Sequence, residues 1–265
     1  MAELPARETW TKAGEGASAE VWAIDEARVL KLFRAGVNDV PVALEYQAGD
    51  WAADQGLPVP RPLARVVVDD RAGIVFQRAS GADMLSVIRR VPGRMWALVG
   101  QLARLHAQVH EKPGNAALPW QIDVLRHRIV RSRAGAAAIE AALQRIDGLE
   151  TGSCLVHGDF HPGNLLLSDA GTTIIDWAQA AVGTAAADVA RTDMLLRFGG
   201  GGGGGVLAGA ITARWYRLCY ARHSSLRSAA IDPWRLPVAV AWHRGQLGPI
   251  EARVERWIAG LMAHK

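Results

Sequence analysis

Four polar side chains lie close together in the stretch HGDFHPGN, and their types suggest a reaction centre. They are His157, Asp159, His161 and Asn164. Apolar runs flank the stretch on both sides, yet a core segment has no need of such a cluster, because buried polar groups must each find a hydrogen-bond partner. A second carboxylate, Asp176 in IIDWA, follows at the end of another strand-like run.

This combination of residues fits phosphoryl transfer. A carboxylate that is free of metal can accept the proton of an attacking alcohol, and Asp159 is the candidate for that role. Mg²⁺ is a hard cation that prefers oxygen ligands, which Asn164 and Asp176 supply. One base, together with a carboxylate and an amide on the metal, is a recurring arrangement in enzymes that transfer phosphoryl groups.

The two segments resemble the catalytic loop and metal-binding motif of the aminoglycoside phosphotransferase family, small-molecule kinases related to the protein kinases. The resemblance implies that Asp159 is the catalytic base and that Asn164 and Asp176 bind Mg²⁺. It gives His157 a structural role in the loop, and we expect His161 to brace the loop rather than take part in the chemistry.

A glycine-rich segment near the amino terminus, AGEGASAEVW, resembles the phosphate-binding loop of kinases. Gly14, Gly16 and Val21 have the kinase spacing, and Ser18 adds a hydroxyl group. Ala19 stands where the protein-kinase pattern has a third glycine. Taken alone, the segment could equally be an ordinary turn.

The residues that follow fit a nucleotide site in the same order along the chain. Lys31, in RVLKLF, stands where the family places the lysine that binds the nucleotide phosphates, and Glu45 matches its ion-pair partner. IVFQRASG resembles the hinge between the lobes, so the backbone of Gln77 and Ala79 is expected to bind adenine. The resemblance therefore implies ATP or GTP, together with Mg²⁺.

The elements that must position these residues change in character along the chain. Short strands surround one helix in the first eighty residues: the helix lies in VPVALEYQAGDWAADQG, and LARVVVDD and AGIVFQR form a hairpin with its turn at DDRAG. Long helices follow, in MWALVGQLARLHAQVH and in one continuous stretch, IDVLRHRIVRSRAGAAAIEAALQRI. Two strand-like runs, GNLLLSD and TTIIDWA, interrupt these helices. The glycine run 199–205 is expected to be a flexible connection between two helices.

These elements predict an α+β chain with the two-lobed fold of protein kinases. Residues 1–80 form a small β-rich lobe that binds the nucleotide, and residues 81–265 form a larger helical lobe for catalysis and acceptor binding. We expect Asp188, in GTAAADVAR, to brace the catalytic loop.

Composition excludes several other classes of protein. The 265 residues are 50% hydrophobic and 21% charged, which is typical of a globular protein. No apolar run is long enough for a membrane span, and no signal peptide is apparent. Two cysteines are too few for a disulfide framework and favour the cytoplasm. The net charge of +4, without a basic tract, argues against nucleic acid as a partner.

The acceptor is expected to be a small molecule with a hydroxyl group. Residues 177–265 contain eleven basic and five acidic side chains, a net charge of +6 that attracts a polycation poorly. The acidic residues are Asp188, Asp193, Asp232, Glu251 and Glu255. A neutral or anionic alcohol, or a macrolide with one amine, therefore competes with an aminoglycoside as the acceptor.

Three other functions remain open at this stage. A hydrolase could bind zinc or manganese through His157, Asp159 and His161, although Asn164 and Asp176 would then have no role. A kinase-fold protein could bind without catalysis, although the base, the metal ligands and the lysine are all present. A protein kinase is disfavoured by IDW in place of DFG and by the lack of an APE-like segment.

Overall fold

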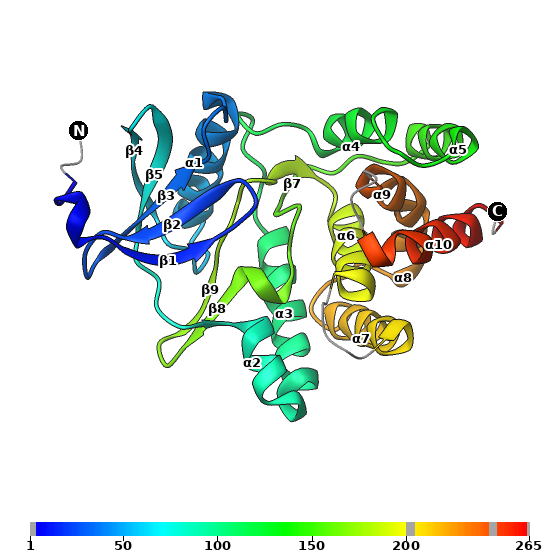
Figure 1. Ribbon diagram of the computed structural model, residues 1–265. Coiled ribbons are helices and arrows are strands. Elements are labelled where there is room, and N and C mark those ends of the chain that lie inside the picture. The colour runs from blue at the N-terminus through cyan, green and yellow to red at the C-terminus, as the bar shows by residue number, and fades with distance from the viewer. Residues whose placement is uncertain (1–3, 200–204, 244–247, 264–265) are drawn as a thin grey trace. The chain divides into compact units, whose positions relative to one another are not determined.

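The chain folds into two compact units, and the first is built around an antiparallel sheet (Figure 1). The structure is a computed structural model and describes residues 4–199, 205–243 and 248–263. The first unit comprises Met1–Met84 and Gly163–Ala180, and the second comprises Leu85–Pro162 and Ala181–Lys265. The lobe boundary after residue 80 stays a prediction, but the segment after the catalytic loop packs with the first unit.

The sheet of the first unit has five strands in the order β1-β2-β3-β5-β4. The strands are β1 (Thr11–Glu15), β2 (Ala19–Ala23), β3 (Arg28–Phe33), β4 (Pro62–Val68) and β5 (Arg71–Gln77). Side chains alternate between the two faces of a strand. In β3, Leu30 and Leu32 therefore join one apolar cluster, while Phe33 joins the other, which includes Val42 of the neighbouring helix. Lys31 points to the same face as Phe33.

Helix α1 (Asp39–Asp54) packs against β4 and β5, and it covers most of the segment 40–56 that was expected to be helical. The side chain of Asn38 caps the amino end by accepting a hydrogen bond from the Val40 N–H at 3.2 Å. Gly56 follows the helix with φ of +73°, a conformation that glycine adopts without strain. The buried stripe of α1 includes Val42 and also Glu45, so this carboxylate faces the sheet.

The hairpin expected at DDRAG is confirmed by strands β4 and β5. Its turn consists of Asp69 and Asp70, which both have positive φ, the conformation of the two-residue turns that match the twist of a hairpin. A second sheet of this unit joins β6 (Ala82–Asp83), β8 (Leu165–Ser168) and β9 (Gly171–Ile174) in the order β6-β8-β9. It brings the segment after the catalytic loop next to the end of the first 84 residues.

Helices make up most of the second unit. They are α2 (Met84–Arg90), α3 (Met95–His110), α4 (Gln121–Val130), α5 (Ala136–Asp147), α6 (Ala185–Phe198), α7 (Gly205–Tyr220), α8 (Ser228–Ile231), α9 (Arg235–Trp242) and α10 (Glu251–Ala263). Strands β7 (Cys154–Val156) and β10 (Ala181–Gly183) pair antiparallel. Helix α6 packs against α7, α8 and α9, so most of its residues are buried. It carries Asp188, Arg191 and Asp193.

The expectation of one continuous helix through IDVLRHRIVRSRAGAAAIEAALQRI is wrong, because the chain leaves the helix between α4 and α5. The N–H of Arg133 donates to the carbonyl of His243 at 2.7 Å, and the Ser132 hydroxyl donates to the same oxygen at 3.0 Å. These bonds to the end of α9 replace bonds within a helix. Gly135 then stands at the amino end of α5.

The glycine run at residues 199–205 lies mostly outside the described residues. Helix α6 ends before it, at Phe198, and α7 begins at Gly205. Among the described residues, no helix has both the length and the apolar character that crossing a membrane requires.

Candidate active site

Lys31, Glu45 and Asp176 meet in the first unit, although Asp176 is 145 residues from Lys31 in the chain. The Lys31 Nζ atom lies 2.6 Å from Glu45 Oε1 and 3.0 Å from Asp176 Oδ1. Burial would lower the pKa of Lys31, but the charges of the two carboxylates outweigh it and raise that pKa. Lys31 is therefore a cation held between two acidic groups.

Glu45 is the buried member of this group and has an unused oxygen. Its side chain is 3% exposed, and burial raises its pKa although Lys31 opposes that change. Among the described residues, its Oε2 atom has no hydrogen-bond partner. Two carboxylates thus face one ammonium group, which leaves a local excess of negative charge beside Asp176.

Asn164 is placed next to Asp176 by the pairing of β8 and β9. Leu165 lies opposite Ile174, and one step further the N–H of Ile175 donates to the carbonyl of Asn164 at 3.0 Å. Asp176 is the next residue and has φ of +64°, which marks a sharp departure from the strand. Asn164 is buried, whereas the Asp176 side chain is 43% exposed and accessible to a ligand.

The predicted glycine-rich loop is the turn between β1 and β2. Gly14 lies in β1, and Gly16 and Ser18 lie in the turn. A Cβ atom added at Gly14 or Gly16 would come no closer than 3.7 Å to protein atoms, so packing within the protein does not require these glycines. Ala19, in place of the third glycine, packs into the core beside Phe33.

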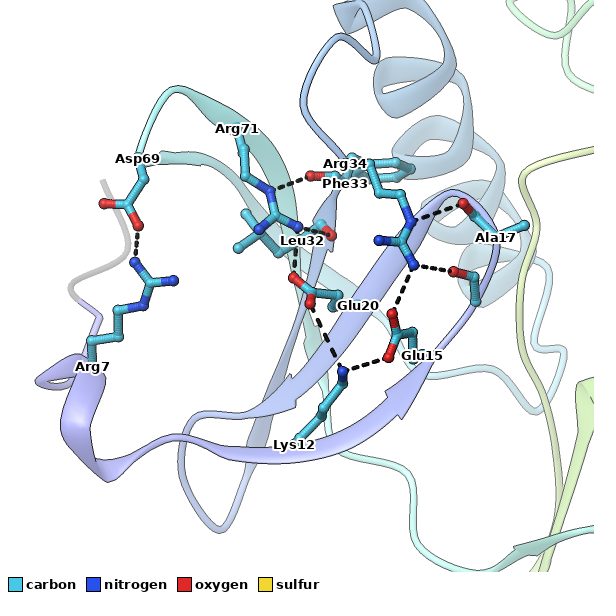
Figure 2. Close-up of polar contacts among 11 residues, drawn as sticks. Arg7, Lys12, Glu15, Ala17, Glu20, Leu32, Phe33, Arg34, Asp69 and Arg71 are labelled. Atoms are coloured by element: carbon cyan, nitrogen blue, oxygen red, sulfur yellow. Dashed lines mark hydrogen bonds and ion pairs between the residues drawn. The ribbon is translucent and has the colours of Figure 1, made fainter.

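Arg34 holds this turn, as Figure 2 shows. Its side chain donates to the carbonyl of Ala17 at 3.0 Å and to that of Gly16 at 3.2 Å, and it pairs with Glu15 at 2.8 Å. Its backbone N–H donates to the carbonyl of Ser18 at 2.9 Å. An arginine three residues after Lys31 therefore fixes the turn to β3. The sequence offered no signal for this role, because it rests on backbone carbonyls.

Gln77 is the last residue of β5, and Ala79 lies two residues beyond it. The N–H of Gln77 already donates to the carbonyl of Arg61 at 2.9 Å. The N–H of Arg78 donates to the carbonyl of Ala27 at 2.7 Å. The predicted contact of Gln77 with adenine would therefore use its carbonyl oxygen.

Asp159 lies in the second unit, and its carboxylate is close to the side chains of Arg191 and His161. Arg191, on α6, places a guanidinium nitrogen 3.2 Å from Asp159 Oδ1, and His161 Nε2 lies 3.7 Å from Oδ2. Burial alone raises the pKa of Asp159, but the hydrogen bond from His161 and the charge of Arg191 outweigh it and lower that pKa to about 2. Asp159 is therefore ionised throughout the physiological pH range.

Asp188 braces the catalytic loop, as expected. Its carboxylate accepts hydrogen bonds from the N–H of His157 at 2.8 Å and from the N–H of Gly158 at 3.0 Å. His106 and His110, both on α3, contact the same carboxylate at 3.0 and 3.2 Å. Burial would raise the pKa of Asp188, but these partners hold it well below its ordinary value. The loop backbone is thus fixed to a buried anion.

The structure groups the predicted residues by unit. The first unit holds the residues predicted for nucleotide and metal, which are Gly14, Gly16, Ser18, Lys31, Glu45, Gln77, Ala79, Asn164 and Asp176. The predicted base, Asp159, belongs to the second unit. Sequence reasoning missed Arg191, because its relation to Asp159 depends on how α6 packs against the catalytic loop.

Two of the acidic residues counted for the acceptor, Asp193 and Asp232, already pair with arginines within the second unit. Asp193 is fully buried, and Arg197, Arg217 and Arg235 surround it at 2.7, 3.0 and 3.7 Å. Asp232 contacts two of these arginines. The carboxylates therefore neutralise arginines of the protein itself.

Several aromatic side chains of the second unit are either buried or paired with arginines of the chain. Tyr216, Tyr220 and Trp234 are buried in the core. Arginines of the chain lie over the other rings at 5.5–5.9 Å, with the pairs Arg191–Trp242, Arg197–Trp257 and Arg222–Trp215. These rings already have cationic partners.

Comparison with known proteins gives one family and many similar folds. A sequence model described as the phosphotransferase enzyme family matches residues 9–226. No curated protein sequence matches the chain. A thermostable mutant of the aminoglycoside phosphotransferase APH(4)-Ia has a TM-score of 0.65 at 15% identity, covering 96% of this chain and 92% of that one.

Two further solved structures show the same protein-kinase-like fold. A choline/ethanolamine kinase family protein from Mesorhizobium loti has a TM-score of 0.65 at 13% identity, covering 96% of this chain and 87% of that one. The amicoumacin kinase hAmiN, solved with AMP-PNP, Ca²⁺ and Ami, has a TM-score of 0.64 at 13% identity and covers 96% and 89%. At these identities the likeness concerns the fold.

Proposed function

Because this chain belongs to the phosphotransferase enzyme family, we propose that it transfers the terminal phosphoryl group of ATP or GTP to a hydroxyl group of a small molecule. The observation that carries the proposal is the meeting of Lys31 with Glu45 and Asp176. Nothing in the local sequence requires a lysine and a carboxylate so far apart to converge. A site for nucleotide phosphates and a metal ion accounts for it.

The residues of the first unit fit a nucleotide with its metal. Asp176 and Asn164 would hold Mg²⁺ through oxygen atoms, and the excess negative charge around Lys31 suits a cation. The bound ion would neutralise charge on the phosphate oxygens. Lys31 would bind the phosphates, and Gly14 and Gly16 would let the backbone of the turn approach them.

In the second unit, Asp159 would orient the acceptor. Its ionised carboxylate accepts a hydrogen bond from the attacking hydroxyl group, and the proton passes to it as the new O–P bond forms and the bond to the leaving oxygen breaks. A pKa of about 2 makes Asp159 a weak base. Phosphoryl transfer tolerates a weak base, because catalysis rests mainly on positioning and charge stabilisation.

The surroundings of Asp159 bear on the charge of the acceptor. An ammonium group on the acceptor would have to compete with Arg191 for the same carboxylate, and Asp193 and Asp232 of this unit already pair with arginines. We therefore propose a neutral or anionic alcohol in preference to a polycation such as kanamycin. Two similar structures were solved in complex with Ami and with hygromycin B, but those ligands belong to those proteins.

Two alternatives fit the geometry less well. A metal hydrolase would need His157 as a ligand, but this side chain is fully buried and its Nδ1 accepts a hydrogen bond from the Asp159 N–H at 3.3 Å. A binding protein without catalysis would have no use for an ionised, braced Asp159. Both cysteines are free, which agrees with the proposed cytoplasmic location.

The test is a screen for nucleotide consumption with ATP and GTP, in Mg²⁺ and in EDTA. The acceptors are aminoglycosides, macrolides, amino alcohols, sugars and hydroxy acids. We expect Mg²⁺-dependent consumption with a neutral or anionic acceptor and little with kanamycin. Efficient phosphorylation of kanamycin would overturn the proposed acceptor class and leave phosphoryl transfer itself intact, whereas failure to bind Mg²⁺-nucleotide would overturn the function.

A further inference from the structure

Three side chains where α9 ends and α10 begins form a group of potential metal ligands outside the candidate active site. His243 directly follows α9, and Glu251 and Glu255 lie on the first two turns of α10. His243 Nε2 is 3.9 Å from Glu251 Oε1 and 3.6 Å from Glu255 Oε1. One ligand atom from each residue lies within 4.8 Å of the other two.

The imidazole of His243 is buried without a partner. The residue is 1% exposed, and among the described residues neither ring nitrogen has a hydrogen-bond partner. Its position is fixed, because Arg133 and Ser132 both donate to its carbonyl oxygen. Buried polar groups nearly always have a hydrogen-bond partner, and a bound metal ion is one recognised reason for an exception.

A second group of histidines in the described part of the chain behaves differently. His106 and His110 both contact Asp188, but each also has a tyrosine hydroxyl group at its other ring nitrogen, at 2.6 and 2.8 Å. All four ring nitrogens there are satisfied by protein groups. That group is a closed hydrogen-bond network, whereas the group around His243 is incomplete.

The spacing around His243 fits a tetrahedral ion. Zn²⁺ binds nitrogen and carboxylate oxygen at about 2.0–2.2 Å, which separates two ligand atoms of a tetrahedron by roughly 3.3–3.6 Å. The observed 3.6 and 3.9 Å are close to this separation and longer than a hydrogen bond. We propose that His243, Glu251 and Glu255 bind one divalent transition-metal ion of the zinc class, with water completing the coordination.

The charges on α10 agree with a cation at this place. Glu251 and Glu255 are four residues apart and share one side of the helix. Neither pairs with a lysine or arginine among the described residues. Arg253 and Arg256, by contrast, line a cavity with Arg197 and Trp257. The two carboxylates carry the negative charge that a divalent ion would balance. An imidazole ligand favours zinc over Mg²⁺.

A bound ion would tie α10 to the end of α9. The three ligands come from both sides of the junction, so the ion would link the carboxyl-terminal helix to the fixed backbone at His243. This site is independent of the proposed phosphotransferase function, and metal binding can be measured without nucleotide or acceptor.

The test compares zinc binding by three metal-stripped proteins. These are the wild type, the double variant Glu251→Gln with Glu255→Gln, and the control Glu140→Gln with Glu150→Gln, which removes two exposed carboxylates elsewhere in the second unit. Calorimetry measures Zn²⁺ binding, and the absorbance of bound Co²⁺ reports tetrahedral coordination. Thermal unfolding with and without Zn²⁺ measures the increase in Tm that a bound ion causes, as a second readout beside affinity.

The wild type and the control should bind one more Zn²⁺ than the double variant, with an increase in Tm that the double variant lacks. Single substitutions should weaken binding by about 10–100-fold or more, since even partners outside the ligand shell have effects of that size. Equal stoichiometry and affinity in wild type and double variant would overturn the site, as would absence of Zn²⁺ binding by the wild type.

Discussion

Replacing Arg191 with Met should make Asp159 easier to protonate. The guanidinium and carboxylate atoms are 3.2 Å apart, and both side chains are less than a third exposed. At an effective dielectric constant of about 20, two charges at this distance interact by about 5 kcal/mol at most. In proteins an opposite charge at such a distance lowers a carboxyl pKa by about 1–3 units, or about 1.4–4 kcal/mol.

The pH dependence follows from the sign of this change. Asp159 has a pKa of about 2 in the folded protein, below that of an unfolded aspartate, so its ionisation stabilises the fold above pH ~4. That stabilisation is lost as the pH falls from about 4 to about 2. In Arg191→Met, the acid limb of kcat/KM should move upward by about 1–3 pH units, from about pH 2 to about pH 3–5.

The assay measures phosphoryl transfer to one neutral acceptor from pH 3 to pH 8, with the carboxyl carbon of Asp159 followed by NMR. Arg191→Lys keeps the charge and should restore most of the wild-type profile. Arg104→Met, on the exposed side of α3, is the control and should change nothing. If Arg191→Met keeps the wild-type acid limb and carboxyl titration, Arg191 does not set the ionisation of Asp159.

Three further changes test the first unit. Asp176→Ala should abolish the difference between Mg²⁺ and EDTA in calorimetric nucleotide binding, and retention of that difference would place the metal elsewhere. Lys31→Met should lower activity and also destabilise the protein by about 3 kcal/mol, because Glu45 stays buried without its partner. The double variant with Glu45→Gln added should regain stability but not activity. Gly81→Ala should lower the free energy of denaturant unfolding by at least about 3 kcal/mol, since φ is +117° and the new Cβ would lie 2.2 Å from a backbone oxygen. Gly93→Ala is the control, because no atom lies within 4 Å of its new Cβ. Equal unfolding free energies for the two variants would show that Gly81 is not required.

Local sequence signals predicted the elements that depend on local structure. Helical spacing of residues marked α1, and the turn residues of DDRAG marked the hairpin between β4 and β5. The family and the fold followed from the motifs at Asp159 and Asp176, because the chemistry of phosphoryl transfer restricts residue type and spacing there. The roles of the individual site residues stay predictions.

Features that depend on packing between distant segments could not be predicted. The break between α4 and α5 exists because the N–H of Arg133 bonds to His243, which is 110 residues further along the chain. The contacts of Arg34 with the glycine-rich turn and of Arg191 with Asp159 have the same origin. Local periodicity contains no information on such contacts.

The proposed phosphotransferase function depends most directly on Asp159 as the residue that orients the acceptor. The decisive measurement is transfer of labelled terminal phosphate from Mg²⁺-ATP to the best acceptor of the screen, by wild type and by Asp159→Asn, with nucleotide affinity measured in parallel. We expect a phosphomonoester product, a rate lower by about 10²–10⁴-fold in the variant, and nearly unchanged nucleotide affinity. Turnover by Asp159→Asn within tenfold of the wild type would contradict the proposed role of Asp159.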